Sequence, residues 1–205
     1  MTTRLNRFNW IASYYDKLVN LIFGKSILEA QHCHLELIPA HANILVLGGG
    51  SGKWVSEIIK TNKTCHILFV DASSKMMDQA KYNLEGVEQV SFIHGTQNDL
   101  PNLHFDVIIT HFFFDMFTTQ QLHMLIEQLD RQLNSPSLWI VSDFEKSKYW
   151  HSLMLKMMFL FFKLSNTIEN NDLPDWNDIM KSQHFKVSKT MSLYGDFIQS
   201  RLYVK

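Results

Sequence analysis

The sequence NILVLGGGSGK, residues 43–53, decides the fold of this chain of 205 residues. Its first five residues form a short run in which apolar side chains dominate, as in a strand buried on both faces of a parallel sheet. The glycines that follow predict a tight turn, and Val55, Ile58 and Ile59 then form one apolar helix face. Such a turn between a strand and a helix brings backbone N–H groups close to a ligand.

The spacing of the glycines separates three kinds of cofactor-binding turn. A dinucleotide turn needs GxGxxG, but counting from Gly48 puts Lys53 at the last glycine position. A phosphate loop needs GxxxxGK followed by Ser or Thr, and here Trp54 follows the lysine. What remains is GxGxG at Gly48, Gly50 and Gly52, which suits a cofactor with an amino-acid tail and no diphosphate.

An acidic residue ends the next predicted strand. Residues 65–70, CHILFV, form another mostly apolar run, and Asp71 follows it directly. A carboxylate at this place can accept hydrogen bonds from both ribose hydroxyls of an adenosine moiety. The turn and the acid together predict binding of a nucleoside cofactor rather than a purely structural turn.

The rest of the chain continues the alternation of strands and helices. Further strands are expected at 87–94, 105–110, 137–142, 184–193 and 197–204, the last two joined as a hairpin through Tyr194-Gly195-Asp196. Helices are expected at 10–22, 25–37, 55–59, 74–84 with Ser74 as the N-cap, 122–133, 153–164 and 174–182.

This order predicts a single domain of the α/β class. Strands that alternate with helices form βαβ units, and seven strands then make a doubly wound, mostly parallel sheet. We expect a helical N-terminal lid over 1–38, a cofactor-binding core over 43–143, and an apolar helix with the C-terminal hairpin over 148–205.

Four motifs, in this order, resemble those of the class I S-adenosylmethionine-dependent methyltransferases: ILVLGGGSGK, FVDASSKMMDQAK, GTQNDLP and FDVIIT. The resemblance covers residues 43–143. The stretch FNWIASYYDKLVNLIFG, residues 8–24, is similar to the N-terminal helix of the ubiquinone/menaquinone methyltransferase-like branch. The resemblance implies a Rossmann-like methyltransferase fold, S-adenosylmethionine as the cofactor and S-adenosylhomocysteine as its product.

The resemblance also implies which residues meet the cofactor. The glycine turn approaches the methionine part, Asp71 binds the ribose and Ala72 packs on the adenine. Residues 96–98 lie near the adenine amino group, and His111 lines the methyl-transfer cleft. The full cofactor-binding set is Gly48, Gly49, Gly50, Gly52, Asp71, Ala72, Thr96, Gln97, Asn98, His111 and Tyr15, the last as part of a lid.

Two positions depart from the family pattern. The family usually has an acidic residue two positions before the first glycine, where this chain has Val46, and often has Asp after the glycine at 95, where this chain has Thr96. The first change removes a partner for the cofactor's amino group. The second removes an adenine acceptor, for which Gln97 or Asn98 could substitute. A cofactor-binding protein without catalysis therefore stays open as the alternative function.

Methyl transfer from a sulfonium is an in-line displacement, so holding the nucleophile and the methyl group in near-attack geometry supplies much of the catalysis. A base is needed only if the acceptor must lose a proton. His111 is the predicted catalytic base, because it follows the fourth strand and titrates near neutral pH. Backbone contact with the cofactor is its alternative role. Asp115, Asp143 and Tyr14-Tyr15 are further candidates, each with a structural alternative.

The acceptor is expected to be a small molecule that is apolar or aromatic. Phe112, Phe113 and Phe114 follow the predicted cleft strand, and residues 153–164 are apolar nearly all round. That segment fits three roles. It could pack as ordinary core, form a wall around an apolar acceptor, or serve as a homodimer surface or transient membrane contact. A nicotinamide-dependent oxidoreductase on a similar sheet is a further alternative, against which Lys53 counts.

The charge balance and the cysteine pattern argue against a nucleic-acid-binding protein and against a metal site. The 19 Lys and Arg residues balance 20 Asp and Glu residues, so the chain lacks the basic excess of a protein that binds nucleic acid through phosphates. No Asn-Pro-Pro-aromatic sequence follows the fourth strand. Cys33 and Cys65 form no CxxC or zinc-binding pattern, which predicts reduced thiols and no metal. We expect a cytoplasmic monomer or homodimer without integral membrane association.

Overall fold

The computed structural model describes residues 23–155 and 173–205. The predicted helix at 10–22, with Tyr14 and Tyr15, lies outside the described residues. So does most of the helix predicted at 153–164, of which only residues 153–155 are described; the described residues 149–155 are helical.

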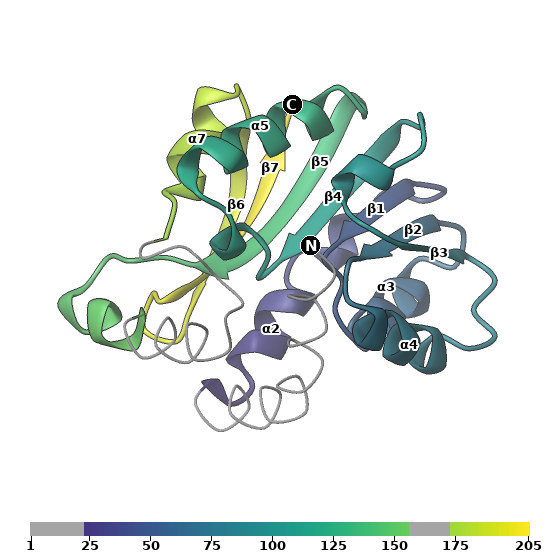
Figure 1. Cartoon of the computed structure of the whole chain (residues 1–205), viewed down its shortest axis with the longest axis horizontal. Coiled ribbons are helices and arrows are strands. Elements are labelled where there is room, and N and C mark those ends of the chain that lie inside the picture. Colours follow the sequence, from purple (N-terminus) through teal and green to yellow (C-terminus); the bar gives the residue numbers. More distant parts are fainter. Residues whose placement is uncertain (1–22, 156–172) are drawn as a thin grey trace.

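The described residues form one seven-stranded sheet in the order β3-β2-β1-β4-β5-β7-β6 (Figure 1). Strands β1 to β5 pair in parallel, and β7 runs antiparallel to both of its neighbours. The predicted doubly wound, mostly parallel sheet with a C-terminal hairpin at one edge is therefore confirmed. The strands are β1 (Asn43–Leu47), β2 (His66–Asp71), β3 (Val90–His94), β4 (Phe105–His111), β5 (Leu133–Phe144), β6 (Lys186–Leu193) and β7 (Ile198–Val204).

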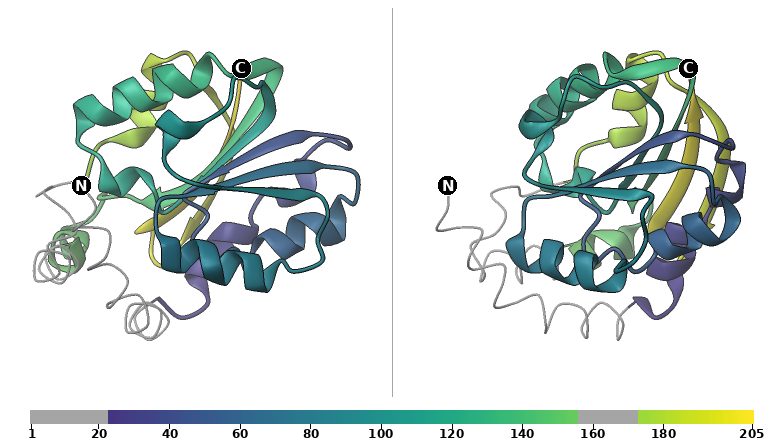
Figure 2. Two further views of the ribbon diagram at one scale, coloured as in Figure 1. Left: turned by 45° about the vertical axis from the view of Figure 1, so that its right-hand side comes forward. Right: turned by 90° about the vertical axis from the view of Figure 1, so that its right-hand side faces the viewer.

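Helices cover both faces of the sheet (Figure 2). One core layer packs α3 (Val55–Thr61), α4 (Ser74–Asn83) and the 3-10 turn η1 (Leu35–Leu37) onto one face. A second layer packs α5 (Thr119–Asp130) and α7 (Trp176–Ser182) onto the other. Besides the helical residues 149–155, the structure has α2 (Ser26–His32), η2 (Gln97–Asp99) and η3 (Phe114–Met116).

The two layers explain why β1 is apolar without alternation. Ile44 and Val46 belong to the core under α3 and α4, while Leu45 and Leu47 belong to the core under α5 and α7. All four side chains are buried. Only a strand covered on both faces needs apolar residues at every position, so the run NILVL and the two-layer architecture have the same cause.

The described part of the predicted N-terminal lid packs onto the sheet through polar contacts. The hydroxyl of Ser142 on β5 donates a 2.9 Å hydrogen bond to the carbonyl of Ala30 in α2 and lies 2.8 Å from the hydroxyl of Ser200 on β7. The ring of His34 lies 3.3 Å from the Ser200 carbonyl oxygen. No helix in the described part of the chain is long and apolar enough to cross a membrane.

Several element ends differ from the predictions. The predicted helix 25–37 is interrupted at His34, whose φ of 68° is left-handed, so it splits into α2 and η1. The N-cap of α4 is Ser73, whose side chain accepts from the Met76 amide, and not Ser74. Helix α5 ends at Asp130, and Leu133 begins β5 instead. Leu133 fits the helical spacing by coincidence, because an apolar residue suits a half-buried position in a strand as well as in a helix.

The glycine at position 49 generates a prediction about stability. A Cβ atom there would lie 2.2 Å from Cε2 of Phe69, a fully buried ring in the core. Gly49→Ala should therefore lower the free energy of unfolding by about 1–3 kcal/mol, measured by urea denaturation. Phe69→Leu should relieve part of the clash, so the double variant should lose less stability than the two single variants together. Strictly additive losses would contradict this packing.

Candidate active site

The candidate site lies where the strand order reverses. Strand β1 sits between β2 and β4, and the chain passes from one side of β1 to the other only after β3 (Figure 1). In open α/β sheets, ligands bind outside the carboxyl ends of the strands at such a switch point. The glycine turn follows β1 at this edge, so the fold places the strongest sequence motif in the position that favours ligand binding.

Gly48 and Gly50 shape the surface of the turn. Both have left-handed backbones, with φ of +70° and +61°. A Cβ atom at Gly48 would lie 2.4 Å from Cδ2 of Phe113, so that ring covers the start of the turn. A Cβ atom at Gly50 would meet nothing within 4 Å. The turn is thus closed by an aromatic ring at one end and open in the middle.

The other two glycines make room for the protein itself. Gly49 is crowded by Phe69 of β2, and a Cβ atom at Gly52 would lie 3.1 Å from Cβ of Ala80 in α4. Gly52 also has a left-handed φ of +70°. Within the predicted GxGxG spacing, Gly50 thus leaves open space beside the turn, and Gly52 allows close packing of a helix.

Asp71 lies against the glycine turn, as its position after β2 predicts. Its Oδ2 accepts a 2.8 Å hydrogen bond from the Gly50 amide, and its Oδ1 accepts one of 2.9 Å from the Ser73 amide. Burial raises the pKa of this carboxyl, and the two amide hydrogen bonds act in the opposite direction. A carboxylate has about four acceptor positions. Two are used by the backbone, which leaves capacity for two ligand hydroxyls.

The turn after β3 contains an acidic residue that the sequence analysis missed. The carboxylate of Asp99 accepts a 2.8 Å hydrogen bond from the Thr96 amide, and the Thr96 hydroxyl accepts one of 3.3 Å from the Asn98 amide. These bonds form a capping box at η2. The hydrogen bond from Thr96 lowers the pKa of Asp99. Thr-x-x-Asp at 96–99 was the sequence signal that could have revealed it.

The remaining predicted adenine contacts lie near this turn. Ala72 is half-buried, and its carbonyl oxygen lies 3.2 Å from Nε2 of His94 at the end of β3. Gln97 is half-buried and Asn98 is exposed. The carbonyl of Gln97 accepts a hydrogen bond from the Gln128 side chain of α5. The predicted contacts of these residues with a cofactor stay predictions.

His111 ends β4 but is 4% exposed, with its ring 4.6 Å from that of Trp54. Burial, and next the charge on His32, lower its pKa to about 3, while a contact with the Gln31 backbone acts in the opposite direction. Among the residues that the structure describes, neither ring nitrogen has a hydrogen bond of good geometry. A neutral imidazole of such low basicity is a weak proton acceptor at pH 7. The catalytic role of His111 stays a prediction that these surroundings do not favour.

Asp143 fixes the turn that follows β4. Its side chain is fully buried, and its Oδ2 accepts hydrogen bonds from the amides of Phe113, at 3.1 Å, and Phe114, at 2.8 Å. Its Oδ1 accepts a third, of 2.8 Å, from the Phe144 amide. Burial raises the pKa of Asp143 to about 6, against the effect of these hydrogen bonds. Burial, and next the negative charge of Asp143, raise the pKa of Asp115 well above its usual value.

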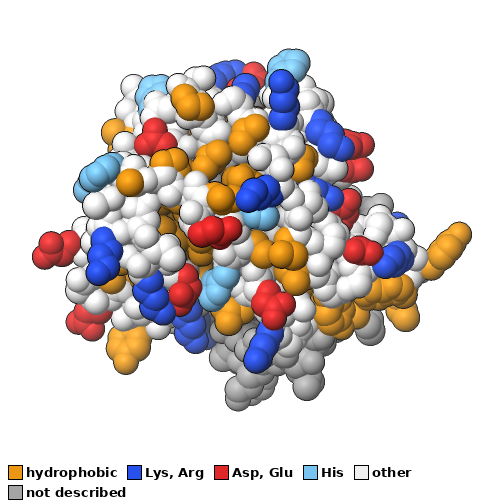
Figure 3. Space-filling view, turned by 180° about the vertical axis from the view of Figure 1, so that it is seen from behind, with side chains coloured by type: hydrophobic (Ala, Val, Ile, Leu, Met, Phe, Trp, Pro, Cys, Tyr) orange, Lys and Arg blue, Asp and Glu red, His pale blue; other side chains and the backbone are white. Residues whose placement is uncertain are grey.

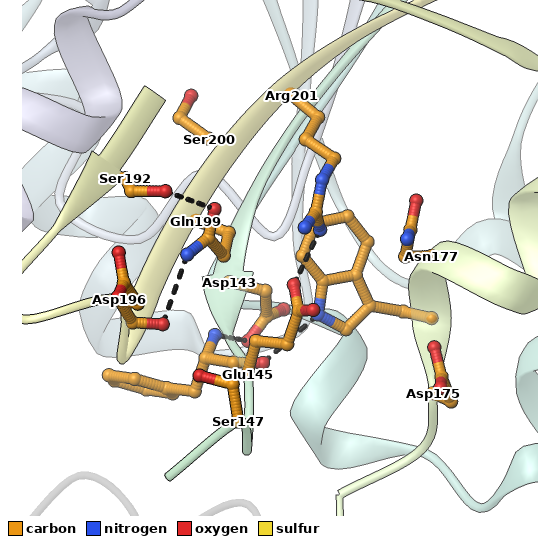
Figure 4. Close-up of polar contacts among 12 residues, drawn as sticks. Asp143, Glu145, Ser147, Asp175, Asn177, Ser192, Asp196, Gln199, Ser200 and Arg201 are labelled. Atoms are coloured by element: carbon orange, nitrogen blue, oxygen red, sulfur yellow. Dashed lines mark hydrogen bonds and ion pairs between the residues drawn. The ribbon is translucent and has the colours of Figure 1, made fainter. Parts of the chain in front are cut away.

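A buried ion pair holds α7 beside this turn and was not foreseen from the sequence. Nη1 of Arg201 on β7 lies 2.6 Å from Oε2 of Glu145, and the guanidinium lies over the Trp176 ring at 4.8 Å from its centroid (Figure 4). The indole N–H of Trp176 donates a 3.0 Å hydrogen bond to the Phe144 carbonyl. These contacts tie the start of α7 to the end of β5, next to Asp143.

Solved structures with the same fold include S-adenosylmethionine-dependent methyltransferases and O-methyltransferases. An S-adenosylmethionine-dependent methyltransferase from Aquifex aeolicus superposes with a TM-score of 0.61 at 15% identity, covering 94% of this chain and 97% of that one. An O-methyltransferase family protein from Burkholderia thailandensis gives 0.72 at 12% identity, covering 95% and 59%. CalO1, a methyltransferase of calicheamicin biosynthesis with bound S-adenosylhomocysteine, gives 0.65 at 12% identity, covering 94% and 56%.

At these identities the likeness establishes the fold, which is the Rossmann-like fold of the class I S-adenosylmethionine-dependent methyltransferases. Residues 44–135 match the family described as "Methyltransferase domain". The matched residues are just under half of the chain, and they include the glycine turn, Asp71 and β4. It spans little more than half of the length of the Burkholderia and calicheamicin neighbours. No curated protein sequence matches the chain.

The buried His111 generates a prediction about pH and stability. A pKa of about 3 in the fold, below the usual 6.5, means that the unfolded chain binds a proton first as the pH falls. Stability from the neutral ring is therefore present above about pH 6.5 and is lost toward pH 3. Between pH 7 and pH 5 the wild type should lose about 2 kcal/mol more than His111→Gln, measured by urea denaturation at both pH values.

The comparison with His111→Gln cancels the other buried groups. The carboxyls of Asp115 and Asp143 have raised pKa values, so they favour the fold as the pH falls, equally in both proteins. Parallel pH dependences for the two proteins would show that His111 can take up a proton without loss of stability.

Proposed function

We propose that this protein transfers a methyl group from S-adenosylmethionine to a small acceptor that is apolar or aromatic. The observation that carries the proposal is the pairing of Asp71 with Gly50. Here a half-buried carboxylate with spare acceptor capacity touches a turn whose central glycine faces open space. A side chain at position 50 would enter that space, so the turn suits a ligand that the backbone must approach closely.

The cofactor would supply an electrophilic methyl group on a positively charged sulfur. The part of the protein is to hold that group. Asp71 would accept hydrogen bonds from the ribose hydroxyls, the turn amides would face the amino-acid tail, and Ala72 would pack against the adenine. Because in-line transfer depends on geometry, a rigid sheet edge that fixes these contacts supplies much of the rate enhancement.

Apolar groups at the exit of β4 support an apolar or aromatic acceptor. Phe112, Phe113 and Phe117 are half-buried there, and Met116 is 51% exposed. Figure 3, which views the molecule from behind relative to Figure 1, shows hydrophobic side chains interleaved with charged groups. Aromatic side chains offer large, rigid contact area to an apolar ligand.

Three groups remain as candidates to take a proton from the acceptor. His111 is the group that the sequence indicates, and Asp115 and Asp143 are the buried carboxyls that the structure brings together. We propose the carboxyl pair ahead of His111. A carboxyl with a pKa of about 6, as at Asp143, can both take up and release a proton near neutral pH.

Binding of the cofactor without turnover is the second candidate function. Val46, at the position where relatives usually carry an acidic residue, is fully buried in the core under α3 and α4. No side chain at this position is therefore available for the cofactor's amino group. The similarity of residues 8–24 to the ubiquinone/menaquinone branch, the cytoplasmic location and the monomeric or dimeric state likewise stay predictions.

The cofactor proposal predicts a specific effect at Asp71. Asp71→Ala should weaken the binding of S-adenosylhomocysteine by about 1–3 kcal/mol, measured by isothermal titration calorimetry, because charge-assisted hydrogen bonds are lost. Asp106→Ala is the matched control. The carboxylate of Asp106 also accepts a 2.8 Å hydrogen bond from a backbone amide, that of Asn43, but at the opposite end of β1. An equal effect of both variants, or tight binding of a nicotinamide dinucleotide instead, would contradict the proposal.

Turnover separates the two candidate functions. With bound S-adenosylmethionine, the wild type should form S-adenosylhomocysteine when offered a panel of phenols, quinols and aromatic amines, detected by mass spectrometry. Polar acceptors of the same size should give less product, because the β4 exit is aromatic. Binding of the cofactor with no product from any acceptor in the panel would favour the non-catalytic function.

A further inference from the structure

The ring of Phe113 occupies a place that no sequence motif assigns. It lies so close to Gly48 that a Cβ atom there would stand 2.4 Å from Cδ2 and 3.0 Å from both Cγ and Cε2. These three atoms are consecutive, so the Cγ–Cδ2–Cε2 side of the ring packs against Gly48. Phe113 is only half-buried, so part of the ring remains accessible at the switch point between β1 and β4.

Several contacts fix this ring in place. The ring of Phe117 meets it in a T-shaped contact with a centroid distance of 5.0 Å. The Phe113 amide donates to the buried carboxylate of Asp143, which also accepts from the Phe114 amide. The preceding residue, Phe112, has a left-handed φ of 51°, which turns the chain sharply after β4. The ring is thus held at the turn by a backbone that Asp143 anchors.

Gly48 is also anchored from the other side. Its amide donates a 2.9 Å hydrogen bond to the Val70 carbonyl at the end of β2. The ring therefore covers a fixed backbone, in the part of the turn that the proposed function gives to the amino-acid tail of the cofactor. The reactive sulfur of S-adenosylmethionine joins that tail to the ribose, so it would lie between the start of the turn and Asp71.

We propose that Phe113 contacts the cofactor and recognises the positive charge on its sulfur through the face of the aromatic ring, and that Asp143 positions it. The inference rests on the proposed function. Aromatic faces attract cations, and desolvated pairs gain most. S-adenosylhomocysteine has the same tail and ribose but a neutral sulfur. The ring should therefore favour the methyl donor over the product and help the product to leave after transfer.

The competing role for the ring is obstruction. A phenyl group over Gly48 could fill the space that the amino-acid tail of the cofactor needs. The two roles predict opposite effects of a smaller side chain. Removing a cation-binding face weakens the charged ligand alone, whereas removing a plug strengthens both ligands.

The test compares the dissociation constants of S-adenosylmethionine and S-adenosylhomocysteine, by isothermal titration calorimetry, for the wild type and Phe113→Leu. The substitution should weaken the binding of S-adenosylmethionine by about 3- to 30-fold, the range of a cation–π contact. It should change the dissociation constant of S-adenosylhomocysteine by about twofold or less. Phe113→Tyr keeps the ring and should keep the preference. Phe92→Leu is the control, because its half-buried ring contacts Phe69 at 5.7 Å and not Gly48.

Asp143→Asn tests the positioning role. The asparagine carbonyl can still accept from the amides of Phe113 and Phe114, but its NH₂ group would face the donor amide of Phe144. The turn should loosen, so the preference for the charged ligand should fall toward that of Phe113→Leu. Loss of stability alone, with the ratio of the two dissociation constants unchanged, would overturn this role, and Phe113→Leu tests the ring without touching Asp143.

Each remaining outcome is decisive. If Phe113→Leu weakened the binding of both ligands equally, the ring would contribute only apolar packing. If it tightened the binding of both, the ring would obstruct the site. Either result overturns the inference. Failure of the wild type to bind either ligand would instead overturn the proposed function, and the inference with it.

Discussion

The close approach of main chain to side chain in the turn after β1 is the constraint on which the site depends. Rings or methyl groups from β2, α4 and the β4 exit press on Gly49, Gly52 and Gly48, and only Gly50 faces open space. Each strand end around the switch point is thereby held at a fixed distance from its neighbours. The Asp71 carboxylate joins the glycine turn to the end of β2 through hydrogen bonds from the Gly50 and Ser73 amides.

Buried polar groups concentrate around the end of β4, and burial there has a physical cost. His111 and Asp143 are each less than 5% exposed. Their side chains lie on opposite faces of the sheet, His111 beside the Trp54 ring and Asp143 beside the Phe114 amide. Asp143 offsets the cost of burial with three amide hydrogen bonds, whereas His111 remains neutral without a partner of good geometry. Polar groups are kept in such places when they fix a backbone that packing alone would leave free.

The predictions for single residues succeeded where one local rule decides and failed where a neighbour distant in sequence decides. The Asp71 position followed from strand ends meeting at one sheet edge. The Thr96–Asp99 capping box was missed, although its spacing is also a local signal. The surroundings of His111 were not readable, because Trp54 and α2 reach its ring from other parts of the chain. The same holds for the ring of Phe113 over Gly48.

The sequence by itself determined the class of fold, the glycine turn and its acidic partner, because strand periodicity, glycine spacing and the acid after β2 are local patterns. Only the tertiary structure decided which glycine stays open, which buried carboxyls affect each other, and which aromatic ring packs against the turn. Those outcomes depend on side chains that meet across the sheet edge from separate strands and helices. Their distances follow from packing, which no spacing along the chain encodes.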